Sequence, residues 1–149
     1  MKHKTIDHIL RSVWMSVSKM YQEEAAKLDS TMATGFTLIS IDPEHGSPST
    51  ALGPKMGMEA TSLSRLLKSM EARELISRKP HPEDGRSVLI CLTDFGLQMR
   101  EYSKEIVLGF DQIVRQKINE TELKTFLKVA ETIMELSQNS SAFSRNKTA

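Results

Sequence analysis

The chain has 149 residues, with 20 Lys or Arg against 19 Asp or Glu, for a formal net charge of +1. This length fits one compact domain, and the composition is typical of a globular protein rich in helix formers. No apolar run is long enough to span a bilayer, and the N-terminus lacks the apolar core of a signal peptide. The single cysteine excludes an intramolecular disulfide and predicts a cytoplasmic protein.

The N-terminal third of the chain predicts three helices. Apolar residues recur at three- and four-residue steps over residues 5–28, which is the spacing of one buried helical face. A break with cap-forming residues follows, and then a short helix that ends at Ile41. Ser47 and Pro48 predict the start of another short helix over 49–56, with a hydroxyl N-cap and proline at the first helical position.

Residues 58–96 predict a helix followed by a β-hairpin. Within 59–71 the apolar side chains share one helical face, and the opposite face carries hydroxyls and cations. Residues 75–79 and 86–92 predict two strands, joined by turn chemistry at 82–85. A short helix, a glycine-containing turn and a second helix form the helix-turn-helix pattern. A polar helix face beside a basic hairpin is therefore a candidate nucleic-acid interface.

The rest of the chain predicts two more helices, so the fold class is mainly α with a small β-hairpin. Thr93 predicts the start of a helix that runs to about residue 118 and is roughly 37 Å long. Asn119 and Glu122 have capping-box spacing before the last helix. The polar residues 139–149 predict a flexible tail.

This order of elements resembles the MarR family of bacterial winged-helix transcription regulators over essentially the whole chain. Asp84 and Arg86 stand two apart, and a Leu-Thr-x-x-Gly pattern opens the next helix, as in that family's wing signature. The segment 62–76 is similar to the family's recognition helix and its exit. Two departures are Glu74, where the family commonly has glycine, and Gly85, where many members have a further wing cation, arginine.

The resemblance implies a winged helix-turn-helix over residues 31–93 and dimerisation helices over 1–30 and 94–138. The apolar stripe of the N-terminal helix, widened by Trp14 and Met15, suits a dimer surface, although ordinary core packing is the alternative. The implied function is a regulator of transcription, as a repressor, that binds a palindromic double-stranded operator as a homodimer. A small phenolic or other lipophilic effector, or an oxidant, would change the spacing of the two DNA-binding domains.

The candidate DNA-binding residues are hydroxyls and cations. Arginine can pair bidentately with guanine, whereas hydroxyls bind bases or phosphates. The candidates on the recognition helix are Thr61, Ser62, Ser64 and Arg65, and the candidate phosphate ligands are Lys68, Arg78 and Lys79. Arg86 is expected in the minor groove, and Asp84 would orient it, either through a backbone N–H or through the guanidinium. A solvated surface is the alternative for all of them.

Three other kinds of site are weighed. Cys91 lies among apolar residues in a strand, which favours a small buried side chain over a thiol redox sensor, the alternative function. An effector pocket is predicted from Val13, Trp14, Val17 and Phe36, with core packing as the alternative. The four histidines lack metal-ligand spacing, so neither a metal nor another cofactor is expected.

Two rival functional classes remain. An enzyme would need a phosphate-binding loop, a nucleophile with its base or paired carboxylates, and no local motif supplies them, so we expect no enzyme. A winged helix that binds only protein partners would lack duplex affinity and its steep dependence on salt.

Overall fold

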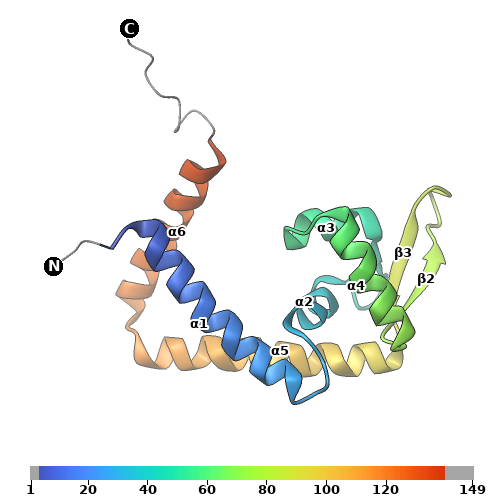
Figure 1. Ribbon diagram of the computed structural model, residues 1–149, viewed down its shortest axis with the longest axis horizontal. Helices are drawn as coiled ribbons and strands as arrows, with labels where there is room; N and C mark the ends of the chain where they lie inside the picture. The colour runs from blue at the N-terminus through green and yellow to red at the C-terminus, as the bar shows by residue number, and fades with distance from the viewer. Residues whose placement is uncertain (1–3, 140–149) are drawn as a thin grey trace, which may run out of the picture. The chain divides into compact units, whose positions relative to one another are not determined.

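The computed structural model describes residues 4–139, which form a mainly α-helical chain with a small antiparallel sheet (Figure 1). The helices are α1 (Ile6–Ala26), α2 (Met32–Ser40), α3 (Ser49–Met56), α4 (Ala60–Ala72), α5 (Asp94–Lys117) and α6 (Glu120–Gln138). The strands are β1 (Ser47–Pro48), β2 (Ile76–Pro80) and β3 (Val88–Leu92). The predicted fold class is confirmed. The predicted tail lies outside the described residues from residue 140 onward.

The chain divides into two compact units, Met1–Val107 and Leu108–Ala149, and α5 passes from the first into the second. The first unit holds α1 to α4, the sheet and the first part of α5, and the second holds the rest of α5 and α6. Within the described part of the chain, no helix combines the length and apolarity that crossing a membrane requires. The predicted division into DNA-binding and dimerisation segments stays a prediction.

The core of the first unit joins buried side chains of α2, α3 and α4 to the sheet and to Met99 of α5. On α4, Leu63, Leu67 and Met70 recur at steps of four and three residues and are at most 5% exposed. Burying a side chain of this size contributes about 1.5–3 kcal/mol. The other buried hydrophobic residues are Leu38, Ile41, Leu52, Leu75, Ile76, Ile90 and Met99. This packing fixes which face of α4 remains in solvent.

The predicted helix over 49–56 is confirmed as α3, but Ser47 and Pro48 form a third strand, so the predicted Ser47 N-cap and Pro48 first helical position are wrong. Ser47 pairs with Ile90 and Pro48 with Leu89, so the sheet has the order β1-β3-β2. The Ser47 hydroxyl accepts a hydrogen bond from the backbone N–H of Asp42 at 2.9 Å instead of capping α3. A strand of two residues has no period to detect, and it forms here because β3 offers a free edge.

Two of the predicted helix starts are confirmed by their caps. Thr93 Oγ1 accepts a hydrogen bond from the backbone N–H of Gly96 at 2.9 Å, at the start of α5. Asn119 Oδ1 accepts one from Glu122 at 2.9 Å, at the start of α6. These bonds depend on residues three apart, so local sequence is enough to predict them.

Glu74 occupies a left-handed backbone conformation, with φ of 59°, where the chain leaves α4 for β2. A side chain in this conformation costs about 1–2 kcal/mol, and glycine avoids that cost at the expense of a more flexible unfolded chain. Replacing Glu74 with glycine should therefore raise the free energy of unfolding by about 0.5–1 kcal/mol.

Urea denaturation measures this difference, and Ala72→Gly is the matched control. Ala72 is exposed and helical at the end of α4. Glycine there should lower stability by about 0.5–1 kcal/mol. Equal losses in both variants would show that the conformation of Glu74 carries no strain.

Candidate nucleic-acid interface

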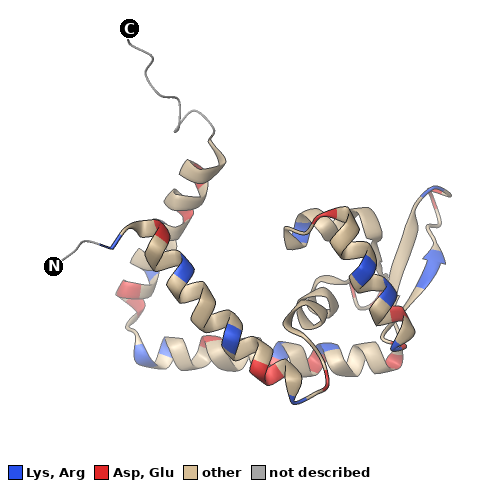
Figure 2. Ribbon diagram, in the orientation of Figure 1, with Lys and Arg blue, Asp and Glu red and all other residues tan. Residues whose placement is uncertain are grey.

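The polar face of α4 is exposed to solvent because its apolar face packs in the core. The exposed side chains on this face are Thr61, Ser62, Ser64, Arg65 and Lys68. Among the described residues, no acidic group forms a salt bridge with Arg65 or Lys68, so both cations are available to an anion. α4 lies beside α3, and both α4 and β2 carry basic residues (Figures 1 and 2).

The two cations on β2 differ in their availability. Arg78 Nε donates to Glu71 Oε2 at 2.7 Å, and the Arg78 side chain is 35% exposed. This ion pair joins α4 to β2 and partly neutralises Arg78. Lys79 is exposed and has no salt bridge within residues 4–139. Lys79 can therefore bind a phosphate without breaking a salt bridge, as predicted, whereas Arg78 would first have to break its ion pair with Glu71.

The tip of the wing, between β2 and β3, is held by hydrogen bonds within the turn. The backbone N–H of His81 donates to Ser87 O at 3.2 Å, and that of Ser87 donates to Asp84 O at 3.0 Å. Asp84 Oδ1 accepts a hydrogen bond from the backbone N–H of Arg86 at 3.0 Å. Of the two roles left open for Asp84, this is the backbone contact. The Arg86 side chain is exposed.

Sequence reasoning missed two hydroxyls at the start of α3. A groove of about 210 Å³ between α3, α4 and β2 is lined by Ser49 and Thr50 together with Ser64 and Arg78. The groove brings residues about 30 positions apart onto one surface, which no local motif can indicate. A pair of hydroxyls that opens the first helix of a helix-turn-helix was the available signal.

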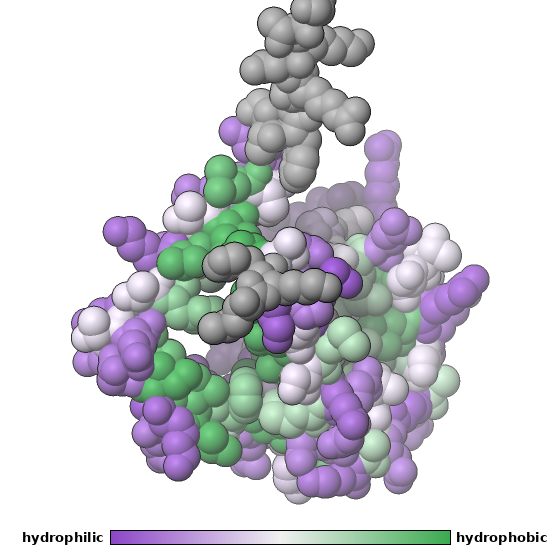
Figure 3. Space-filling model, turned by 60° about the vertical axis from the view of Figure 1, so that its left-hand side comes forward, coloured by the Kyte–Doolittle hydropathy of each residue, from purple (hydrophilic) through white to green (hydrophobic). Residues whose placement is uncertain are grey.

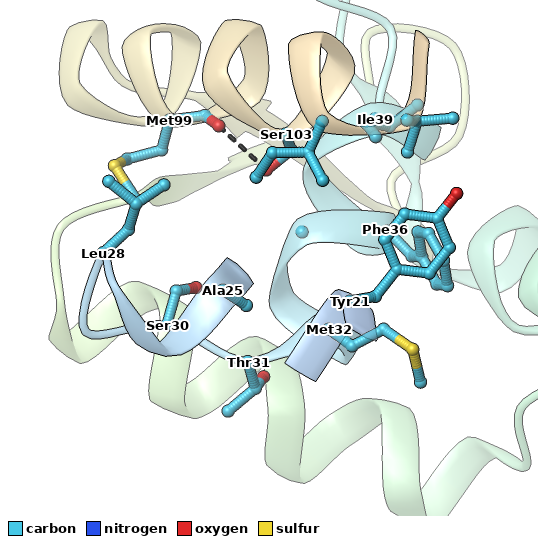
Figure 4. A pocket seen from close by; sticks show the side chains of 13 residues that line it. Tyr21, Ala25, Leu28, Ser30, Thr31, Met32, Phe36, Ile39, Met99 and Ser103 are labelled. Carbon is cyan, nitrogen blue, oxygen red and sulfur yellow. Dashed lines mark hydrogen bonds between the residues drawn. The ribbon is translucent and has the colours of Figure 1, made fainter. Parts of the chain in front are cut away.

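A small apolar cavity lies in the first unit between α1, α2 and α5 (Figure 4). The Tyr21 and Phe36 rings meet there edge to face, with centroids 5.5 Å apart. Ser103 Oγ donates to Met99 O at 2.9 Å on the opposite wall, as the dashed line shows. None of the lining residues is Lys, Arg, Asp, Glu or His.

Of the four residues predicted to line an effector pocket, Phe36 lines this cavity. Val13 and Trp14 are 55% and 52% exposed on α1, and Val17 is half-buried. These three residues are absent from the cavity wall, so their effector role stays a prediction. The cavity volume is about 30 Å³. A benzene-sized ligand needs roughly 150 Å³, so any effector would have to displace side chains.

The remaining candidates are Cys91 and the residue types that bind metals. Cys91 is half-buried in β3, paired with Ser77 on β2, and its thiol lies close to Gly46. In the part of the chain that the structure describes, no group of three or more His, Cys, Asp or Glu residues could hold a metal ion.

Large hydrophobic side chains lie exposed on both units. On α1 they are 43% to 71% exposed: Ile6, Ile9, Leu10, Val13, Trp14 and Met15. In the second unit they are 41% to 62% exposed: Leu108, Ile113, Ile118, Phe126, Leu127, Val129, Met134 and Leu136. Figure 3 shows hydrophobic side chains gathered in continuous patches on the molecular surface. Patches of this kind mark interaction surfaces.

Comparison with known proteins gives one family. The sequence model of the MarR family matches residues 30–88. An organic hydroperoxide resistance transcriptional regulator of Bacillus subtilis is 30% identical over 99 residues, which cover 64% of this chain and 67% of that protein. The transcriptional repressor NicR of Pseudomonas putida is 22% identical over 135 residues, covering 90% of this chain and 85% of NicR.

Solved structures share the fold. The S. aureus MepR–DNA complex superposes with a TM-score of 0.79 at 22% identity, covering 91% of this chain and 99% of the MepR chain. Wild-type MarR from E. coli, in its apo form, has a TM-score of 0.70 at 21% identity, covering 89% and 98%. The chain belongs to the MarR family, and it is a transcription regulator rather than an enzyme.

Proposed function

We propose that this regulator is a repressor that binds a palindromic double-stranded operator as a homodimer, with α4 in the major groove. The observation that carries the proposal is the exposed face of α4, where Arg65 and Lys68 have no salt bridge within the described chain. Two relatives support it, because MepR was solved in complex with DNA and NicR is a transcriptional repressor. We place this DNA-binding regulator in the bacterial cytoplasm, where its operator would lie.

Each candidate residue takes a role that follows from its chemistry. Arg65 would pair with a guanine, and the α4 hydroxyls would contact bases or phosphates. Lys68 and Lys79 would neutralise phosphates, and Arg78 would join them after exchanging Glu71 for a phosphate. Arg86, at the tip of the wing, would enter the minor groove. The hydroxyls concerned are those of Thr61, Ser62 and Ser64.

The second copy of the chain would cover the exposed apolar faces of α1 and of residues 108–139. Each large side chain fully withdrawn from water contributes about 1.5–3 kcal/mol, so even partial cover of these faces stabilises a dimer. A twofold dimer presents its two α4 helices with the symmetry of a palindrome, and the operator half-sites would lie one helical turn apart.

A small effector would act through the cavity between α1, α2 and α5. The cavity wall carries aromatic rings, methionine and hydroxyls but no charge. Burying an ionised carboxylate there is costly, so the wall favours an uncharged lipophilic or phenolic molecule. Because the cavity is small, binding requires the Tyr21–Phe36 pair to separate, which would shift α1 against α2 and change operator affinity.

Fluorescence anisotropy with palindromes from the upstream DNA of the gene tests the proposal. Wild-type affinity should fall with salt, with a slope of about −0.9 in log K against log salt per phosphate neutralised. Arg65→Ala should remove about 1–3 kcal/mol of discrimination between the operator and random duplex. Lys68→Ala should weaken both duplexes alike and reduce the salt slope by about 1.

The pair of variants separates base contacts from phosphate contacts on one helix face. Identical behaviour of Arg65→Ala and Lys68→Ala would contradict the assigned roles. A flat salt response without duplex affinity would favour a winged helix that binds only protein partners.

A further inference from the structure

We infer that His81 is a positioning residue for Arg86: its imidazole fixes the tip of the wing and thereby aims the Arg86 side chain at the minor groove. The inference rests on the proposed DNA-binding function. It assigns a role to a residue that the proposed function does not place in contact with DNA.

The imidazole of His81 acts as a hydrogen-bond acceptor for the turn. Its Nδ1 accepts from the backbone N–H of Glu83 and from that of Asp84, each at 3.2 Å. A ring nitrogen accepts hydrogen bonds through its lone pair, so this geometry uses Nδ1 as the acceptor atom. The ring is half-buried, whereas Glu83 and Asp84 are exposed. His81 is therefore the inner support of an otherwise solvated turn.

Asp84 transmits this support to Arg86. Its backbone N–H is bound to the His81 ring, and its Oδ1 accepts from the backbone N–H of Arg86 at 3.0 Å. The intervening Gly85 has no atom near the position that a Cβ would occupy, so packing does not hold it. Without the ring, two backbone N–H groups lose their acceptor and the turn relaxes. Arg86 would then have to be ordered during binding, at a cost in affinity.

A direct contact between the His81 ring and a phosphate is the competing role. The charged residues near His81 in the chain are Lys79, Glu83, Asp84 and Arg86. No salt bridge within residues 4–139 involves His81. The two roles use different groups of the ring, because positioning needs an acceptor at Nδ1 whereas a phosphate contact needs a ring N–H donor.

Four variants measured by anisotropy against the same operator test the positioning role. His81→Ala should weaken binding about three- to tenfold, the range expected for losing a bonded acceptor. His81→Asn should stay within about twofold of wild type, because Asn Oδ1 can take the place of Nδ1. Arg86→Ala should weaken binding at least as much as His81→Ala. The double variant should be no weaker than Arg86→Ala, since His81 acts through Arg86.

Rescue by His81→Asn and the proton position on the His81 ring are readouts that a merely structural role would not move. In the free protein at about pH 8, long-range ¹H–¹⁵N NMR should show His81 Nδ1 without a proton. Unchanged circular dichroism of every variant confirms that the fold is intact.

Three results would overturn the inference while wild type still binds the operator. They are full affinity of His81→Ala, failure of His81→Asn to restore binding, and additive losses in the double variant. If wild type binds no duplex at all, the proposed function fails, and the NMR result then still tests the geometry of the turn.

Discussion

Gly96→Ala should lower the free energy of unfolding by about 3 kcal/mol or more. Gly96 on α5 packs against the backbone of Leu75, just before β2, and leaves no room for a side chain. A Cβ on Gly96 would overlap the carbonyl oxygen of Leu75. Overlap with a backbone carbonyl cannot be relieved by a rotamer change, so either α5 or the chain before β2 must move.

Neither of these segments can move cheaply. Leu75 is fully buried, and its carbonyl oxygen also accepts a hydrogen bond from the backbone N–H of Thr93 at 3.1 Å. Thr93 Oγ1 donates to Glu74 O at 2.5 Å and accepts from the backbone N–H of Gly96 at 2.9 Å. The glycine therefore lies inside a closed set of bonds that joins the start of α5 to the end of α4.

Gly109→Ala is the matched control within the same helix. A Cβ on Gly109 meets no atom within 4 Å. Alanine there should raise stability by up to about 1 kcal/mol through helix propensity. Urea or thermal unfolding of both variants measures the contrast. Equal stabilisation by the two alanines would show that α5 does not press on Leu75 in solution.

Phe126→Asp should convert the dimer to a monomer and weaken operator binding by about 100-fold or more. Phe126 is 62% exposed on α6 and forms part of the apolar surface that we assign to the second copy. The substitution removes a large buried ring from the dimer and places a carboxylate there instead. A monomer engages one half-site at a time, so operator affinity falls together with dimer affinity.

Lys128→Asp places a carboxylate on the polar side of α6, which Lys128 shares with Lys124, Glu131 and Glu135. It should leave both the dimer and operator affinity unchanged. Sedimentation velocity gives the oligomeric state, and anisotropy gives the affinity. A Phe126→Asp variant that remains dimeric and binds the operator at full strength would exclude this face of α6 from the interface.

Features that depend on residues three or four apart were predictable from the chain alone. The apolar spacing of Leu63, Leu67 and Met70 determines which side of α4 is buried, and hence which side is free to contact DNA. The caps at Thr93 and Asn119 formed as predicted for the same reason. Asp84 and Arg86 are two residues apart, so the hydrogen bond from the Arg86 backbone N–H to the Asp84 carboxylate was one of the two predicted roles of Asp84.

Contacts between residues distant in the chain required the tertiary structure. Ser47 resembles a helix cap locally but forms a strand, because pairing with β3 offers its backbone a partner that local sequence does not reveal. Arg78 resembles a free cation, yet folding places it against Glu71. The acceptor role of His81 depends on the shape of the turn, and the cavity depends on α5 meeting α1 and α2. Periodicity describes one element at a time, whereas these features depend on how elements meet.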